Sequence, residues 1–311
     1  MMRLLWWAKQ ALVVLGAVLL SLSSAWAGGP PAQKLPSALL VFPLVQVSED
    51  QPNHLAQDTR IELVNLSGDP QLVECFYIDG ASCNEIGFMV LLTPYQPMAW
   101  LASSGLNSGS SAAPPFFGTG ELKCAVQATL PDLDSHNAIQ GRATIFTSSN
   151  GQSASYGAVG FQRLSAGDYT GVFKLDGTTY AQCPSRLHFD VLTADQPTSS
   201  SEMVLVPCTE NLLTQTPTSL GVQFVIYNEF ESQFSTASTL KCFDQRPLTD
   251  IGAGTLTRAV VGTDTAHVVV RGSGGPLLGL VVDEVPFRGT TGTAGNEPSF
   301  EGGSSATVTF P

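Results

Sequence analysis

The chain has 311 residues, of which only 13% are charged, and its 26 acidic side chains outnumber 14 basic ones. A net charge of −12 gives it no electrostatic reason to bind nucleic acid or anionic lipid, so neither is expected as a partner. Lys is scarce, while Gly, Ser, Thr and Pro are abundant; this composition opposes a helical protein and favours short strands joined by turns.

Residues 1–27 predict a signal peptide that is cleaved on export. Arg3 and Lys9 form a basic start, an uncharged apolar run follows, and Ala25-Trp26-Ala27 matches an A-x-A cleavage pattern. The apolar run is about 12 residues, whereas a spanning helix needs roughly 20. We therefore expect a secreted, periplasmic or cell-surface protein of 284 residues, with a net charge of −14 and no membrane span.

Six cysteines follow the signal peptide. An even number in an exported chain predicts disulfides, and the lack of any C-x-x-C pair argues against zinc. Cys75 and Cys83 flank a hairpin pattern with a three-residue loop ending in Gly80, which predicts a Cys75–Cys83 bridge across the hairpin. Cys124–Cys183 and Cys208–Cys242 are assigned only because both members of each pair fall in the same half of the chain.

Strand patterns follow one another along the mature chain. After a leader at 28–36, alternating or apolar runs recur through residue 192, interrupted by a Pro- and Gly-rich segment at 93–119. A polar, unpatterned stretch at 194–202 is interpreted as a linker. We therefore expect one domain at 37–193 and another at 203–311, the second containing a Gly/Ser/Thr-rich segment at 288–305.

A faint internal repeat links the two halves. Leu40-Val-Phe-Pro43 resembles Leu205-Val-Pro207, Ile61–Asn65 resembles Phe224–Asn228, and Val73–Phe76 resembles Leu240–Phe243, at offsets of 164, 163 and 167 residues. Strands can also look alike through composition alone. Because the three matches keep their order and spacing, we expect an all-β fold of two tandem β-sandwich (immunoglobulin-like) domains.

The segment at 93–119 is the best candidate for a binding site. It carries Tyr95, Trp100, Phe116 and Phe117 among small residues, and aromatic side chains on loops are suited to recognition. The alternative is that these rings fold back and cap the core of the sandwich, which the apolar neighbours of Trp100 favour.

Catalytic and metal motifs are weak. Arg186, His188 and Asp190 share one face of a predicted strand, where a His–carboxylate pair could do acid–base chemistry, but opposite charges are also ordinary on a solvated sheet face. Acidic turns at 48–54 and 132–137 lack the spacing of a calcium loop. No catalytic residue, metal or cofactor is therefore expected.

These observations predict an exported bacterial structural or binding protein, envelope-associated or adhesion-like, that recognises an unknown protein or glycan on a surface. The alternatives are an extracytoplasmic hydrolase using His188 and Asp190, and an assembly factor that lends an edge strand to its partners.

Overall fold

The computed structural model describes residues 35–51, 54–109, 111–127, 137–148, 151–165, 171–194, 200–287 and 290–311. The predicted signal peptide, the leader up to residue 34 and most of the acidic turn at 132–137 lie outside these ranges. The described residues are nearly all β and form several sheets, with two short helical turns, η1 (Leu248–Ala253) and α2 (Arg258–Val261). The expected all-β fold is confirmed.

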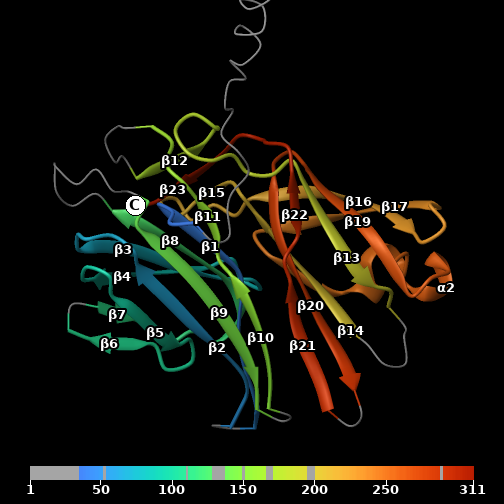
Figure 1. The fold of residues 1–311 in the computed structure, drawn as a ribbon, viewed down its shortest axis with the longest axis horizontal. Helices are drawn as coiled ribbons and strands as arrows, with labels where there is room; N and C mark the ends of the chain where they lie inside the picture. The colour runs from blue at the N-terminus through green and yellow to red at the C-terminus, as the bar shows by residue number, and fades with distance from the viewer. Residues whose placement is uncertain are drawn as a thin grey trace, which may run out of the picture.

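Within the described ranges, 11 strands of the first half form one hydrogen-bonded set that divides at β1 (Figure 1). One sheet runs β11–β1–β8–β3–β4–β7–β6, and the other runs β10–β9–β2–β5. The end of β1 joins them by pairing with the start of β2. The strand bounds are β1 Leu39–Gln51, β2 His54–Asn65, β3 Gln71–Asp79, β4 Glu85–Leu92, β5 Pro97–Leu101, β6 Leu106–Ser108, β7 Ser111–Ala113, β8 Gly118–Gln127, β9 Ile139–Thr147, β10 Gln152–Gly157 and β11 Val159–Phe161.

The first core lies between these two sheets. β2 shows why the strands form, because Ile61 and Leu63 point inward and are buried, while Arg60 is exposed. Such alternation buries one face of a sheet and leaves the other to solvent. The core draws apolar side chains from both sheets, including Phe42, Ile61, Val73, Tyr77, Val90, Trp100, Leu122 and Ile145.

The second half builds another pair of sheets. A five-stranded sheet runs β17–β16–β19–β13–β22 and a four-stranded sheet runs β18–β14–β20–β21. Their strand bounds are β13 Arg186–Leu192, β14 Ser200–Pro207, β16 Ser219–Asn228, β17 Gln233–Lys241, β18 Asp244–Pro247, β19 Thr265–Ser273, β20 Leu277–Phe287, β21 Thr290–Asn296 and β22 Ser299–Glu301. A core between them includes Phe189, Leu205, Phe224 and Val268.

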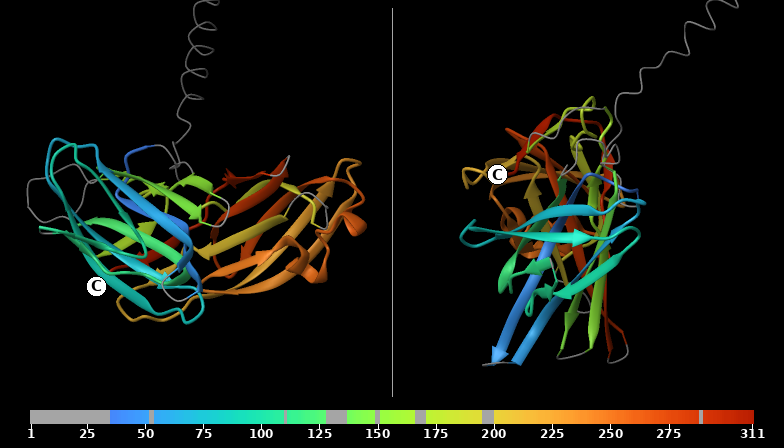
Figure 2. Two further views of the ribbon diagram at one scale, coloured as in Figure 1. Left: turned by 90° about the horizontal axis from the view of Figure 1, so that it is seen from below. Right: turned by 90° about the vertical axis from the view of Figure 1, so that its left-hand side faces the viewer.

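A small third sheet joins the halves. Its strands are β12 (Val172–Leu175), β23 (Ala306–Thr309) and β15 (Glu210–Asn211), with β23 in the middle. A third core gathers side chains from this sheet, from β1 and β3, and from β14 and β20, among them Phe76, Phe161, Phe173, Val206, Leu278 and Phe310. The two halves lie side by side along the long axis, with β10 against β21 between them (Figures 1 and 2).

The expected linker at 194–202 does not separate the two halves. β13 precedes it yet pairs with β19 in the five-stranded sheet, from Leu187 opposite Val270 to Leu192 opposite Thr265. β14 already begins at Ser200. β13 therefore belongs to a sheet of the second half, because strand pairing decides membership of a sheet.

All three predicted cysteine pairings are wrong: Cys75–Cys83, Cys124–Cys183 and Cys208–Cys242 are not bonded. The described disulfides are Cys75–Cys124, Cys83–Cys242 and Cys183–Cys208. β3 continues to Asp79 and β4 begins at Glu85, so the turn is longer than three residues and Cys75 lies opposite Phe88. On its other edge β3 pairs with β8, which places Cys75 directly opposite Cys124.

Cys83 lies in the turn between β3 and β4 and reaches Cys242 in the second half, 159 residues away in the sequence. Gly80, in the same turn, does not have the positive φ that the predicted three-residue hairpin loop required. A Cβ on Gly80 would lie 2.4 Å from the ring of Phe243, so this position needs glycine for the close approach of the two halves.

Candidate functional site

The segment at 93–119 separates its four aromatic residues. Tyr95 and Phe117 are exposed, at 68% and 55%, whereas Trp100 and Phe116 are buried. The Trp100 indole N–H donates to the Tyr77 hydroxyl at 2.7 Å, inside the first core. Phe116 stacks on the ring of Tyr77 at a centroid distance of 4.9 Å. Trp100 and Phe116 therefore stabilise the sandwich and cannot contact a ligand from these positions.

The segment does create a shallow groove on the outer surface. β6 and β7 fold back beside β4, with Leu106 opposite Ala113 and Ala112 opposite Met89. The groove has a volume of about 690 Å³ and is open to solvent. It is lined mainly by apolar side chains and prolines, including Ile86, Met89, Leu106, Pro114 and Pro115. Ile86 and Met89 are exposed large hydrophobic residues, so this surface could receive an apolar or extended partner.

His188 and Asp190 lie on the outer face of the five-stranded sheet but do not contact each other. The Nε2 atom of His188 lies 2.6 Å from Oε2 of Glu301 on β22. Asp190 instead lies 2.8 Å from Nδ1 of His267, on the neighbouring strand β19. Nδ1 of His188 and Nε2 of His267 are 3.1 Å apart. The four side chains form a line, carboxylate–imidazole–imidazole–carboxylate.

This line lacks the features of a hydrolytic site. In the described part of the chain, no serine, threonine or cysteine side chain is hydrogen-bonded to His188 or His267. A general base for nucleophilic catalysis needs such a partner within hydrogen-bond reach. Neither Glu301 nor His267 was singled out from the sequence, because the signal there was confined to one strand.

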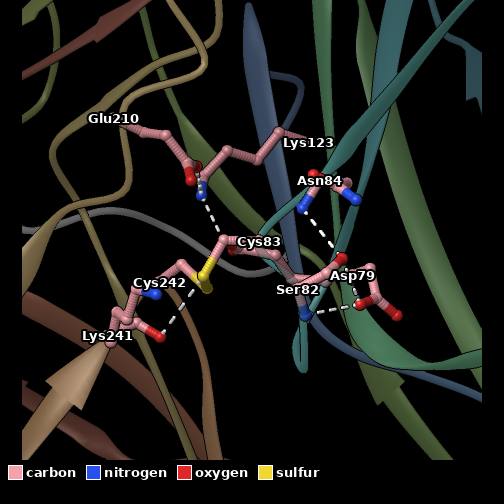
Figure 3. The surroundings of a disulfide bond; sticks show 9 residues. Asp79, Ser82, Cys83, Asn84, Lys123, Glu210, Lys241 and Cys242 are labelled. Atoms are coloured by element: carbon pink, nitrogen blue, oxygen red, sulfur yellow. Dashed lines mark hydrogen bonds and ion pairs between the residues drawn. A yellow bond between two sulfur atoms is a disulfide. The ribbon is translucent and has the colours of Figure 1, made fainter.

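A buried charge cluster lies beside the Cys83–Cys242 disulfide at the junction of the halves (Figure 3). Glu121 and Lys123 alternate along β8, and their side chains are fully buried. The Lys123 ammonium donates to Glu121 at 2.6 Å and also to Glu210, on β15 of the third sheet. Among the described residues, neither Oε2 of Glu121 nor Oε2 of nearby Glu85 has a hydrogen-bond partner.

Burial governs the protonation of this cluster. It raises the pKa of Glu121 to about 8, although Lys123 opposes the shift, and it raises the pKa of Glu85 to about 7. Burial alone would lower the pKa of Lys123, but Glu121 and Glu210 outweigh it and the pKa is raised. Lys123 is therefore held in its charged form, while burial favours the protonated form of Glu121.

In the described ranges, no three His, Cys, Asp or Glu side chains are placed to hold a metal ion together. Across the same ranges, no helix combines the length and the apolar character needed to cross a membrane. The three disulfides indicate that the protein folds in an oxidising, extracytoplasmic environment.

Comparison with known proteins adds little. No protein-family model and no curated protein matches the chain. Among solved structures it is similar to the PBSX exported protein XepA, at 9% identity over 77% of this chain and 85% of that one, with a TM-score of 0.18. It is also similar to the structure of infectious bursal disease virus Gt strain, at 12% identity, 89% and 76% coverage and a TM-score of 0.15. At such low TM-scores neither similarity supports an inference, so the chain is assigned to no family.

Proposed function

We propose that this chain is an exported, non-catalytic structural or binding protein, associated with the bacterial envelope or acting like an adhesin. The groove between β4 and the segment at 93–119 is the observation that carries this proposal. It is an apolar surface held by a rigid sandwich, with Phe117 exposed on the chain that leads from it into β8. The ligand is a protein or glycan presented on a surface.

Cross-linking supports a structural role. Cys83–Cys242 and the third core tie the two halves into one body, and Cys183–Cys208 adds a link between the third sheet region and β14. Disulfides limit the unfolded ensemble and persist outside the cytoplasm. A stiff, cross-linked β protein suits the envelope or the cell exterior, and a cleaved signal peptide at residues 1–27 would deliver it there.

The proposal includes two immunoglobulin-like sandwiches that arose by duplication. Asn65 ends β2 and Asn228 ends β16, and each uses its side chain in the same way. Oδ1 accepts the backbone N–H two residues later, and Nδ2 donates to a distant carbonyl, of Thr93 in one case and Val261 in the other. The third repeat match is weaker, because Cys75 lies within β3 whereas Cys242 lies between β17 and β18.

The hydrolase alternative has less support. His188 is engaged by Glu301 and His267, so Asp190 cannot orient it as a catalytic base. The contact between β10 and β21 covers two sheet edges with each other, which leaves fewer edges for an assembly factor to lend.

Binding is tested with the purified mature protein on a glycan array and on immobilised bacterial envelope fragments. Ile86→Ser and Phe117→Ser should each reduce binding at least about fivefold, since a central apolar contact contributes more than 1 kcal/mol. Phe230→Ser is the matched control, because Phe230 is a more exposed aromatic residue in the second half. Equal loss in all three variants, or no binding by the unmodified protein, would contradict the proposal.

Export is tested separately by expressing the full chain in a bacterium. The mature product should begin at Gly28 and lie outside the cytoplasm. A cytoplasmic product that retains residues 1–27 would reject the signal peptide, whatever the binding experiment shows.

A further inference from the structure

We propose that His188 and His267 together bind a divalent transition-metal ion, of the class that includes zinc and copper, on the outer face of the five-stranded sheet. This site lies in the second half and does not depend on the proposed binding groove.

Strand pairing places the two rings next to each other. β13 and β19 are antiparallel neighbours, with His188 opposite Val269 and Asp190 opposite His267. The histidines are thus diagonal neighbours on one face of the sheet, and their rings lie with centroids 5.3 Å apart. Their side chains are 24% and 42% exposed, so an ion can reach them from solvent without any rearrangement of the core.

The carboxylates decide which ring nitrogens carry hydrogen. A neutral imidazole has a single N–H, and an ionised carboxylate can only accept. Glu301 faces Nε2 of His188, and Asp190 faces Nδ1 of His267. If each ring donates to its carboxylate, Nδ1 of His188 and Nε2 of His267 both keep a lone pair and lie 3.1 Å apart. A cation between them, either a proton or a metal ion, stabilises this arrangement.

Glu301 is held in place from both sides. Its Oε2 atom faces His188, and Arg186 donates to the other carboxylate oxygen at 2.7 Å. Tyr227 lies opposite His267 on β16, and the Asn296 amide donates to the backbone oxygen of Asp190. The cations Arg186 and Arg271 on this face donate to Glu301 and Gln223. Two carboxylates, those of Glu301 and Asp190, contact the rings directly and favour a cation there.

The spacing fits a metal as well as a proton. Two nitrogens bound about 2.0–2.1 Å from one tetrahedral zinc ion lie roughly 3.3 Å apart, and a small ring rotation would reach that separation. Histidines that bind metals characteristically donate their second N–H to a carboxylate, and each ring here has a carboxylate within reach of its other nitrogen. Imidazole ligands suit zinc, copper and nickel. Water would complete the coordination, because the described residues offer no third ligand.

The test is calorimetric titration of zinc chloride into the tag-free mature protein, with its disulfides intact and metals removed by a chelator. We expect one ion per chain. His188→Gln or His267→Gln should reduce the affinity at least tenfold. Asp190→Asn and Glu301→Gln should reduce it by about 10–100-fold, because they release the ring orientation while leaving both ligands in place.

His54→Gln is the matched control. Its Nδ1 atom lies 2.5 Å from Asp50, but within the described residues no second imidazole contacts it. His136→Gln covers the fourth histidine, which lies outside the described ranges. Both controls should bind zinc like the unmodified protein.

Two results would overturn the proposal. One is the absence of a stoichiometric binding event in the unmodified protein, which would leave a shared proton between the rings. The other is binding that survives His188→Gln and His267→Gln. His188, His267, Asp190 and Glu301 are partly or fully exposed, so unchanged circular dichroism and disulfide maps would show that an affected titration reports the site and not misfolding.

Discussion

Replacing Lys123 by Met should strongly destabilise the junction between the two halves. Lys123 is fully buried and contacts both Glu121 and Glu210, whose side chains are also buried. Met keeps the length of the aliphatic stem, so little cavity forms and the effect is electrostatic. Removing one partner of a buried ion pair costs about 3–5 kcal/mol, because the remaining charge has no compensation. Glu121 can remain protonated, so the uncompensated charge is mainly that of Glu210.

The assay is urea unfolding at neutral pH with the disulfides intact, followed by circular dichroism and by the fluorescence of Trp100. Lys174→Met is the control, because Lys174 is exposed on β12 and its loss should change the free energy of unfolding by less than about 0.5 kcal/mol. Substituting all three members of the cluster by apolar residues should recover most of the loss, since no buried charge is then left.

An unfolding free energy for Lys123→Met within about 1 kcal/mol of that of the unmodified protein would contradict this prediction, because an uncompensated buried charge costs much more. A triple apolar variant no more stable than Lys123→Met would also contradict it, because the loss of stability would then come from packing.

Three further outcomes are expected. The free energy of unfolding should fall as the pH rises from about 4.5 to about 8. The pKa of Glu121 is about 8 in the folded chain, so this carboxyl ionises at lower pH in the unfolded chain. Urea unfolding across this range should show a weaker pH dependence of that free energy for Glu121→Gln, and an equal pH dependence would contradict the assignment. Tyr77→Phe removes the acceptor of the buried Trp100 indole N–H and should cost about 1–3 kcal/mol by the same assay; a neutral effect would show that the indole finds another acceptor. Alanine at both positions of the Cys83–Cys242 disulfide should lower the free energy of unfolding by about 5 kcal/mol, against about 3.5 kcal/mol for the Cys183–Cys208 disulfide. The difference arises because Cys83–Cys242 closes the longer loop. A larger loss for the Cys183–Cys208 variant, or peptide maps with other cysteine pairs, would refute this.

The strands could be predicted because their periodicity is local. Ile61 and Leu63 alternate with polar neighbours, and the alternation of β13 around His188 is equally clear. A strand that buries one face must show this pattern in any arrangement of sheets. The pattern does not say which strand lies next to which, and so β13 was assigned to the wrong half.

The prediction of the cysteine pairs was wrong for the same reason. Cys75 lies beside Cys124 only because β8 inserts between β1 and β3, and nothing near either cysteine indicates that neighbour. Cys83 meets Cys242 across the junction of the halves. Assigning pairs within each half assumed that the halves fold separately, whereas two of the three cores contain side chains from both.

The candidate sites show what a single strand can reveal. His188 and Asp190 were correctly placed on one face, but the partners of this pair arrive from β19 and β22. Glu121 and Lys123 alternate like residues on a solvated face, yet the third sheet covers that face and buries them. The aromatic residues at 93–119 differ in burial: Trp100 and Phe116 lie in the first core, while Tyr95 and Phe117 are exposed.

The junction combines two kinds of contact with different consequences. The third core supplies nonspecific attraction, since burial of apolar surface favours many relative positions of the halves. The ion pair of Lys123 and Glu210 is compatible with few relative positions of the halves, because displacing one half against the other leaves a charge buried without its partner. Cys83–Cys242 lies beside this ion pair, so the junction that satisfies the ion pair also brings these two sulfur atoms together for oxidation. We infer that the buried charges select the docked arrangement and that the disulfide then fixes it.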